Sequence, residues 1–358
     1  MFDTIKRWLL YLNDPSHVAR FQNLCGLKLI TSTSNGHSKC TKSSNYSITN
    51  KYFYYLFNLG SMFGDEGFLI MFFSMLLLNY DDTIGRQVML YWSIVMYIGQ
   101  AMKDLFQMDR PSSPPVVILE QRYLLEYGMP STHAMAAVAV PAGLVLNVHK
   151  KIPYYIYLAI LSSVLWCLLI SFSRLYKGVH SLADVIVGIV VAIVLVAFMC
   201  PWIEDFHHMV VTKISGIIIL FIIILCMALI YPDPTIWKSG RSDTYMILGS
   251  IFGVMLGSHI DYIIRNYEEI VLPEATLTMH IARFLLGVVV IVCCRFLYKP
   301  ILVRVTAKIL NLDPKIDENR QNKYFELIYK CSMYTLLGVM ISFIIPRLSY
   351  KCDLGRLY

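Results

Sequence analysis

The stretch Ser173-Arg-Leu-Tyr-Lys-Gly-Val-His-Ser-Leu-Ala-Asp184 is a polar, basic turn between two long apolar runs. His180 and Asp184 stand four residues apart in it, so on a helix both side chains would project from one face. The carboxylate of Asp184 could then hold one ring nitrogen of His180, while the other nitrogen attacks or is protonated. This is the arrangement of a nucleophile with its orienting group. Taken alone, the pair could equally be an ordinary contact on a helix surface.

Two further polar stretches, residues 103–111 and 130–133, lie where apolar runs meet loops rich in Gly, Pro and Ser. The first adds the cations Lys103 and Arg110 to Arg174. Such a cluster suits a phosphoryl group, because fixed positive charges stabilise its equatorial oxygens during transfer. Lys103 and Arg110 are about two helical turns apart, so both can face one pocket, although Lys103 could also simply reach the membrane surface.

The second stretch, Pro130-Ser-Thr-His133, supplies an acid and an anion-binding helix end. Cleavage of a phosphate ester leaves an alkoxide, so an acid is needed opposite the nucleophile, and His133 is the candidate. A histidine there could also cap the helix or face solvent. Ser131 and the N–H group of Thr132 can bind a phosphate oxygen. His133, His180 and Asp184 could alternatively bind zinc, but adjacent cations would repel a divalent ion, so we expect no metal and no cofactor.

In order, K-x6-R-P, P-S-x-H and S-R-x5-H-x3-D resemble the three motifs of the type 2 phosphatidic acid phosphatase (PAP2) superfamily, with Thr132 where many members have glycine. Residues 95–100, 110–115 and 126–136 resemble the sphingosine 1-phosphate phosphatases within it. The resemblance implies a six-helix catalytic core and a sphingoid base phosphate as substrate. It also implies that His180 forms a phosphohistidine, that Asp184 orients it, and that the third motif, with Ser173 and Arg174, binds phosphate.

The composition indicates a membrane protein. Of 358 residues, 57% are hydrophobic and 15% charged, whereas a soluble domain of this size has about 25% charged residues. An all-α, polytopic transmembrane helix bundle of about nine spans is expected, since a span needs about 20 mostly apolar residues. The predicted spans are 54–79, 87–107, 132–149, 154–173, 181–200, 214–231, 245–263, 281–298 and 332–348.

The pattern predicts three regions. Residues 1–53 read as an amphipathic helix on a membrane surface followed by a flexible linker, 54–231 as the catalytic membrane core, and 232–358 as additional transmembrane helices. Basic residues interrupt the interval 299–331, which therefore reads as an interfacial helix and loop. No cleavable signal is expected at the N-terminus, so the first span would direct targeting.

The net charge of +7 fits anionic lipid headgroups and a phosphate substrate better than nucleic acid. The nine cysteines include no C-x-x-C pair and read as small hydrophobic residues of a membrane bundle. The sequence does not indicate an oligomeric state.

The predicted spans place all three motifs on one side of the membrane, but two signals disagree about which side. Residues 1–53 and 299–330 each hold seven Lys or Arg on that side, which by the positive-inside rule favours the cytosol. The Asn45-Tyr-Ser47 sequon and the family resemblance favour the lumen of the endoplasmic reticulum. We expect a multi-pass protein of that membrane with a lumenal active site.

Glu66, beside Asp65, lies inside an otherwise apolar predicted span. A carboxylate there is costly and normally has a partner or a function. It could form a buried pair that fixes helix packing. Alternatively it could meet the ammonium group of a sphingoid base, which phosphatidic acid lacks, and so discriminate between the two lipids. Glu126, next to residues 130–133, is the competing candidate for that contact.

Two other functions stay open at this point. A phosphatase with the same site could act on phosphatidic acid, a polyprenyl diphosphate or a sugar phosphate. A membrane transporter or channel could line its pathway with these charges. The transporter is disfavoured because the polar residues gather at one face and the chain lacks the internal repeats typical of transporters.

Overall fold

The computed structural model describes residues 2–30, 46–151, 153–233, 237–265 and 276–354. These residues are almost entirely helical, which confirms the all-α prediction. The elements are α1 (Phe2–Leu12), α2 (Pro15–Leu24), β1 (Leu27–Leu29), β2 (Tyr46–Ile48), α3 (Lys51–Gly64), α4 (Glu66–Met75), α5 (Asp82–Phe106), α6 (Thr132–Lys151), α7 (Ile156–Tyr176), α8 (Leu182–Met199), α9 (Ile203–Thr212), α10 (Ile214–Ile230), α11 (Ser239–Ile264), α12 (Leu277–Leu310), α13 (Asp317–Arg320), α14 (Lys323–Val339) and α15 (Ile345–Lys351). Short π-helical segments follow α4 (Leu76–Tyr80) and α14 (Met340–Ile344), and 3-10 turns cover Gln121–Leu125 and Pro153–Tyr155.

Six of the described helices are long and apolar enough to cross a membrane, and each overlaps a predicted span: 132–149, 153–176, 182–199, 239–264, 277–310 and 323–351. Two bent pairs raise the number to eight if each is one span. Residues 51–64 and 66–80 bend by 61°, and residues 203–212 and 214–230 bend by 114°. The chain is therefore a multi-pass membrane protein. The remaining predicted span, 87–107, falls on α5, which is more polar than the helices above. The count of nine spans therefore stays a prediction.

The predicted interfacial helix over 299–331 does not begin as an element separate from the preceding span. α12 continues without interruption from Leu277 to Leu310, although Pro300 lies inside it. The helix persists because its apolar face continues past the proline, where Leu302 packs with Met333 and Leu337 of α14. At about 1.5 Å per residue, α12 is longer than the hydrocarbon core of a bilayer, so it extends beyond that core.

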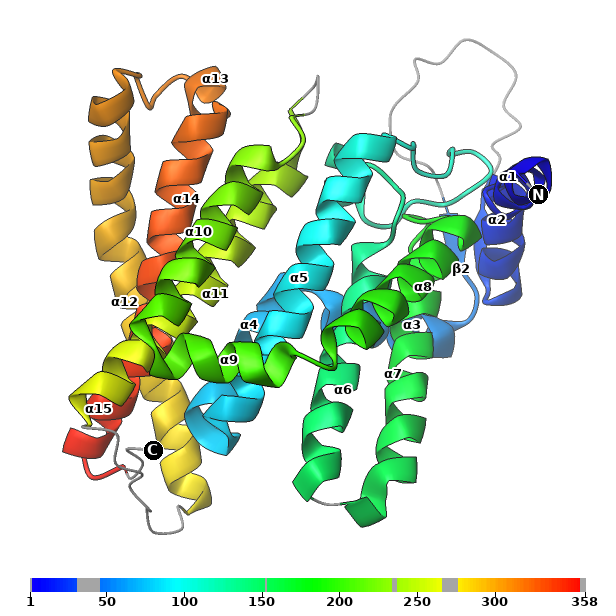
Figure 1. The fold of residues 1–358 in the computed structure, drawn as a ribbon. Helices are drawn as coiled ribbons and strands as arrows, with labels where there is room; N and C mark the ends of the chain where they lie inside the picture. Colours follow the sequence, from blue (N-terminus) through cyan, green and yellow to red (C-terminus); the bar gives the residue numbers. More distant parts are fainter. Residues whose placement is uncertain (1, 31–45, 152, 234–236, 266–275, 355–358) are drawn as a thin grey trace.

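α5 lies in the middle of the bundle, with α6, α7 and α8 on one side and α10, α11, α12 and α14 on the other (Figure 1). One continuous apolar core crosses it, from Val88 of α5 and Met135 of α6 to Met255 of α11. α11 and α14 cross so closely that a Cβ atom on Gly253 would lie 2.1 Å from the carbonyl oxygen of Thr335. Small residues allow this backbone approach in membrane bundles. The C-terminal helices are thereby packed against the core rather than appended to it.

The N-terminal segment forms two helices, α1 and α2, rather than one, because Asp14 caps a new helix at Pro15. β1 and β2 pair antiparallel, with Lys28 opposite Ser47. Gln22 is buried in α2, and its side chain donates to the carbonyl oxygens of Val117 (2.7 Å) and Tyr176 (2.9 Å). These bonds fasten the N-terminal segment to the loops that carry the polar motifs.

Candidate active site

The three polar motifs meet at one end of the bundle. Figure 1 shows that α5 ends where α6 begins, and that the turn from α7 into α8 lies at the same end. Gln107 ends α5 in a left-handed conformation, with its N–H bonded to the carbonyl oxygen of Lys103. Gly178 ends the α7 turn at φ +71, where a Cβ atom would lie 2.2 Å from the carbonyl oxygen of Val117. A residue with a side chain would be strained and crowded at that position.

His180 and Asp184 are both 1% exposed, and Nδ1 of His180 lies 3.4 Å from Oδ2 of Asp184. They are not joined by helical spacing as predicted, because α8 begins only at Leu182 and His180 belongs to the preceding turn. A capping box brings them together instead. Asp184 Oδ2 accepts from the N–H of Ser181 (2.8 Å), and the Ser181 hydroxyl accepts from the N–H of Asp184 (3.1 Å). The cap holds the carboxylate beside the imidazole.

Arg110 lies on the other side of His180, with its Nη1 atom 3.2 Å from His180 Nε2. The guanidinium is held by the carbonyl oxygens of Val179 (2.5 Å) and Glu126 (3.0 Å). Burial, followed by the charges of Arg110 and Arg174, lowers the pKa of His180 well below its usual range. The free imidazole is therefore neutral near pH 7, which is the form that acts as a nucleophile.

Lys103 and Arg174 complete the group of cations. Nζ of Lys103 bonds to Glu126 Oε2 (2.6 Å) and to Thr132 Oγ1 (3.1 Å). Arg174 is 0% exposed; its Nη1 donates to Ser61 Oγ (2.9 Å) and lies 3.6 Å from Glu120 Oε2. Burial would raise the pKa of Glu126, but Lys103 and Arg110 outweigh it and lower that pKa to about 2. Glu126 is thus an ionised partner of two cations.

Several buried donors that converge on this site have no hydrogen-bond partner in the described part of the chain. They are Arg110 Nη2, Arg174 Nε and Nη2, and the hydroxyl of Ser131. Buried polar groups are rarely left unpaired in proteins, and leaving a charged one so is costly. Four donor atoms that converge without acceptors fit an anion with several oxygens, and we call them the phosphate pocket.

His133 lies at the start of α6 and belongs to the same site. Its Nε2 lies 3.2 Å from the hydroxyl of Tyr123 and 3.6 Å from Asp65 Oδ1. Tyr123 in turn donates to Asp65 (2.9 Å). Asp65 lies at the break between α3 and α4. The chain packs closely against His133 there, because a Cβ atom on Gly64 would lie 2.6 Å from His133 Cδ2. The break therefore brings a carboxylate to a histidine that can transfer a proton.

The structure thus brings nine of the proposed site residues together: Lys103, Arg110, Glu126, Ser131, Thr132, His133, Arg174, His180 and Asp184. Ser173 is not among them, because its hydroxyl donates to the carbonyl oxygen of Ile170 in its own helix (2.6 Å). Glu66 begins α4 and is exposed. Among the described residues, no group of three or more His, Cys, Asp or Glu is placed to hold a metal ion.

Four contributing residues were not identified from the sequence: Ser61, Glu120, Tyr123 and Lys177. Lys177 pairs with Glu120 (3.1 Å), and Tyr123 places its ring 4.6 Å from the guanidinium of Arg174. None of these residues belongs to a motif with fixed spacing. The one local signal for this part of the site was the acidic pair Asp65-Glu66 within an apolar predicted span. In the sequence this pair favoured Glu66, whereas Asp65 is the residue that contacts His133.

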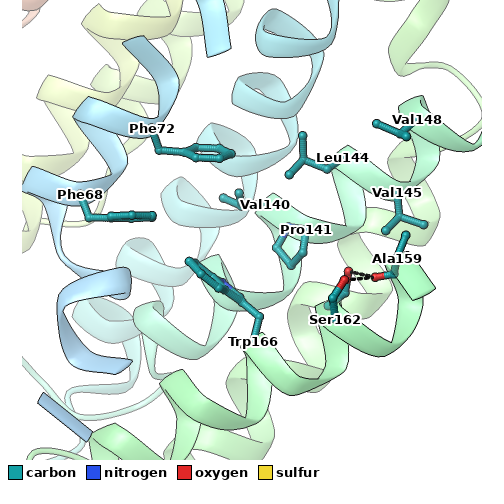
Figure 2. Close-up of a pocket in the computed structure, with 11 residues that line it drawn as sticks. Phe68, Phe72, Val140, Pro141, Leu144, Val145, Val148, Ala159, Ser162 and Trp166 are labelled. Carbon is teal, nitrogen blue, oxygen red and sulfur yellow. Dashed lines mark hydrogen bonds between the residues drawn. The ribbon is translucent and has the colours of Figure 1, made fainter. Parts of the chain in front are cut away.

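An apolar cavity of about 300 Å³ lies between α4, α6 and α7 (Figure 2). Val140, Leu144 and Val148 recur on α6 at helical spacing from His133, so they lie on the same face of that helix. Trp166 stands eight residues before Arg174 on α7, again on nearly the same face. The complete lining is Phe68, Phe72, Val140, Pro141, Leu144, Val145, Val148, Ala159, Ser162, Ser163 and Trp166. The cavity therefore lies along α6 and α7, the helices that also carry His133 and Arg174, and its lining contains none of the site residues.

Residues 85–208, which contain all three motifs, match the PAP2 superfamily. The chain is 32% identical to sphingosine-1-phosphate phosphatase 1 of Mus musculus over 84% of this chain and 72% of that protein. It is 31% identical to sphingosine-1-phosphate phosphatase 2 of Mus musculus over 94% and 96%, and 32% identical to the Homo sapiens protein of that name over 85% and 79%. No solved structure matches the chain. Motifs, site and relatives agree: the chain belongs to the sphingosine-1-phosphate phosphatases of the PAP2 superfamily and is a phosphoric monoester hydrolase.

Proposed function

We propose that this enzyme hydrolyses sphingosine 1-phosphate and dihydrosphingosine 1-phosphate to the sphingoid base and phosphate, through a phosphohistidine and without a metal. The phosphate pocket carries the proposal: four buried donor atoms of Arg110, Arg174 and Ser131 lack acceptors beside a neutral histidine. A phosphate monoester would satisfy these donors and present its phosphorus to His180. The names of the relatives supply the lipid class.

In the first step, a ring nitrogen of His180 attacks phosphorus, and the bond from phosphorus to the lipid oxygen breaks. Protonated His133 gives its proton to that oxygen, so the sphingoid base leaves as an alcohol. Asp184 stabilises the positive charge that develops on His180, while Lys103, Arg110 and Arg174 stabilise the charge on the phosphoryl oxygens. Ser131 and the N–H group of Thr132 bind a phosphoryl oxygen at the N-terminus of α6.

In the second step, His133 takes a proton from water, the resulting hydroxide attacks phosphorus, and the bond from nitrogen to phosphorus breaks. Phosphate leaves and His180 returns to its neutral form. Tyr123 and Asp65 keep the ring of His133 oriented through both steps, at 3.2 Å and 3.6 Å from its Nε2.

Purified protein is expected to release phosphate from sphingosine 1-phosphate at an undiminished rate in the presence of EDTA, because basic side chains take the role of a metal. Free phosphate is measured with and without the chelator, and with zinc or magnesium added back. A rate that falls in EDTA and recovers with one metal would contradict the metal-independent mechanism. Absence of phosphate release under every condition would contradict the proposed substrate.

The cavity in Figure 2 is proposed to take the hydrocarbon chain of the lipid. Leu144→Trp is expected to fill it and raise KM for a long-chain sphingoid base phosphate by about 10-fold or more, since several buried methylene contacts are lost. A phosphate with a short chain should be unaffected. Leu161→Trp is the matched control, because Leu161 is exposed on α7 and does not line the cavity. Equal effects of Leu144→Trp on long and short chains would place the hydrocarbon elsewhere.

We further propose that the enzyme resides in the endoplasmic reticulum membrane with its active site facing the lumen. Asn45 lies outside the described residues, but Ser47 of its sequon belongs to β2. β2 packs with Val117 and Tyr176 at the end of the bundle that holds the site. A glycan on this sequon and the active site would therefore share one side of the membrane.

A further inference from the structure

Three ionisable side chains from different helices are close enough to interact electrostatically: Glu66 at the start of α4, Asp243 in α11 and Lys330 in α14. Asp243 interacts electrostatically with Glu66 and Lys330, and also with Glu126 and Lys103 of the active site. Glu66 likewise interacts with Glu126, Arg122 and Lys330. We call Glu66, Asp243 and Lys330 the amine cluster.

The amine cluster adjoins the segment between α5 and α6, which carries Glu126, through α11. Ser239, one helical turn before Asp243, donates to Glu126 Oε1 (3.3 Å), and Glu126 holds Lys103. α11 also approaches α5 closely, so that a Cβ atom on Gly240 would lie 3.2 Å from Gln100 Oε1. Asp243 is one turn along from this contact, and its electrostatic interactions with Glu126 and Lys103 place it near the active site.

The charges of the cluster are not paired internally. In the described part of the chain, none of the three side chains forms an ion pair within 4.0 Å, and Lys330 Nζ donates to the sulfur of Met246, at 3.6 Å. Two carboxylates and one ammonium leave a net charge of −1 if all three are ionised. An unbalanced charge among packed membrane helices is costly, so it normally marks a ligand site.

Two observations favour a hydrogen-bond donating cation as the ligand. Gln100 is buried, and its Oε1, an acceptor, has no hydrogen-bond partner among the described residues. Glu66 is exposed and Asp243 partly so, which leaves room for a small group to reach both. Glu126 is less suited, because Lys103 and Arg110 already balance its charge.

We propose that Asp243 and Glu66 bind the ammonium group of the sphingoid base, and so select aminated lipid phosphates over lipids without the amine. The ammonium stands on the carbon next to the one that carries the phosphate, so a phosphate held by Arg110 and Arg174 presents it a few bonds away. The inference rests on the proposed function. It assigns substrate selection to α11, which lies outside the PAP2-matching residues 85–208.

The test compares kcat/KM for sphingosine 1-phosphate and for an analogue that lacks the amine, in wild type and Asp243→Asn. The variant should lose about 10- to 100-fold on the aminated lipid, the size expected for one charge-assisted contact, and change little on the analogue. Asp243→Glu should retain the preference of wild type. Asp205→Asn is the matched control, because Asp205 is an exposed carboxylate on α9.

The ratio of the two kcat/KM values does not depend on how much of the protein is folded, so reduced stability of Asp243→Asn does not obscure the result. Glu66→Gln provides a second reading and should shift the ratio in the same direction. An unchanged ratio in both variants would overturn the amine assignment while leaving the phosphatase intact. A wild-type enzyme inactive on both lipids would instead overturn the proposed function.

Discussion

Substitution of His180 by alanine is expected to lower turnover by about 10⁴-fold or more and to abolish any acid-labile phosphoenzyme, because the nucleophile is removed. The cations and the hydroxyl of Ser131 would remain, so substrate should still bind. Phosphate release and trapped, labelled phosphoenzyme are measured on the same preparation. His208→Ala is the control, since His208 is an exposed histidine on α9 and belongs to none of the three motifs.

His133→Ala separates the roles of the two histidines. It should slow cleavage of the natural alcohol ester far more than cleavage of an aryl phosphate, whose leaving group needs little protonation. Phosphoenzyme that persists undiminished in His180→Ala would transfer the role of nucleophile to another residue.

The second large effect is expected for Arg174. Arg174→Ala should lower kcat/KM by about 10²- to 10³-fold, because Nε and Nη2 of this buried guanidinium are free to bind the phosphoryl oxygens while Nη1 is held by Ser61. Arg174→Lys keeps the charge but not the planar fork, so it should recover only part of the loss. The measurement is phosphate release at several substrate concentrations.

Arg304→Ala is the matched control, because Arg304 is an exposed arginine on α12. Arg110→Ala should resemble Arg174→Ala, since Arg110 Nη2 also lacks a hydrogen-bond partner. Near-normal activity in both arginine variants would show that phosphate binds at a different place.

The helical class, the approximate positions of the apolar helices, and the family could all be predicted from the sequence. A membrane helix must satisfy its backbone hydrogen bonds within itself, so a run of about 20 apolar residues indicates a span without knowledge of its neighbours. The three motifs could be found for a similar reason, since Lys103 to Arg110 and Arg174 to Asp184 are local spacings. The division at residues 53 and 231 stays a prediction.

Helix ends were harder to predict, because packing decides them. Pro300 and the basic residues around it favour an interruption, yet contacts of Leu302 with α14 keep α12 helical to Leu310. His180 and Asp184 have the spacing of a helix pair, but the capping box of Ser181 starts α8 after the histidine. Local preferences of this size are easily outweighed by tertiary contacts.

By itself the sequence determined which residues can bind a phosphate or attack it, because charge and nucleophilicity are properties of the side chains. The three motifs contain these side chains. Only the tertiary structure decided which of them work together. Asp65 reaches His133 through a bend in the first span, and Ser61 holds Arg174 from another helix. Asp243 is likewise brought to Glu66 by the packing of α11. These contacts join residues far apart in the chain, and the physical reason is that burial of apolar helix faces, not sequence spacing, sets which polar side chains share a site.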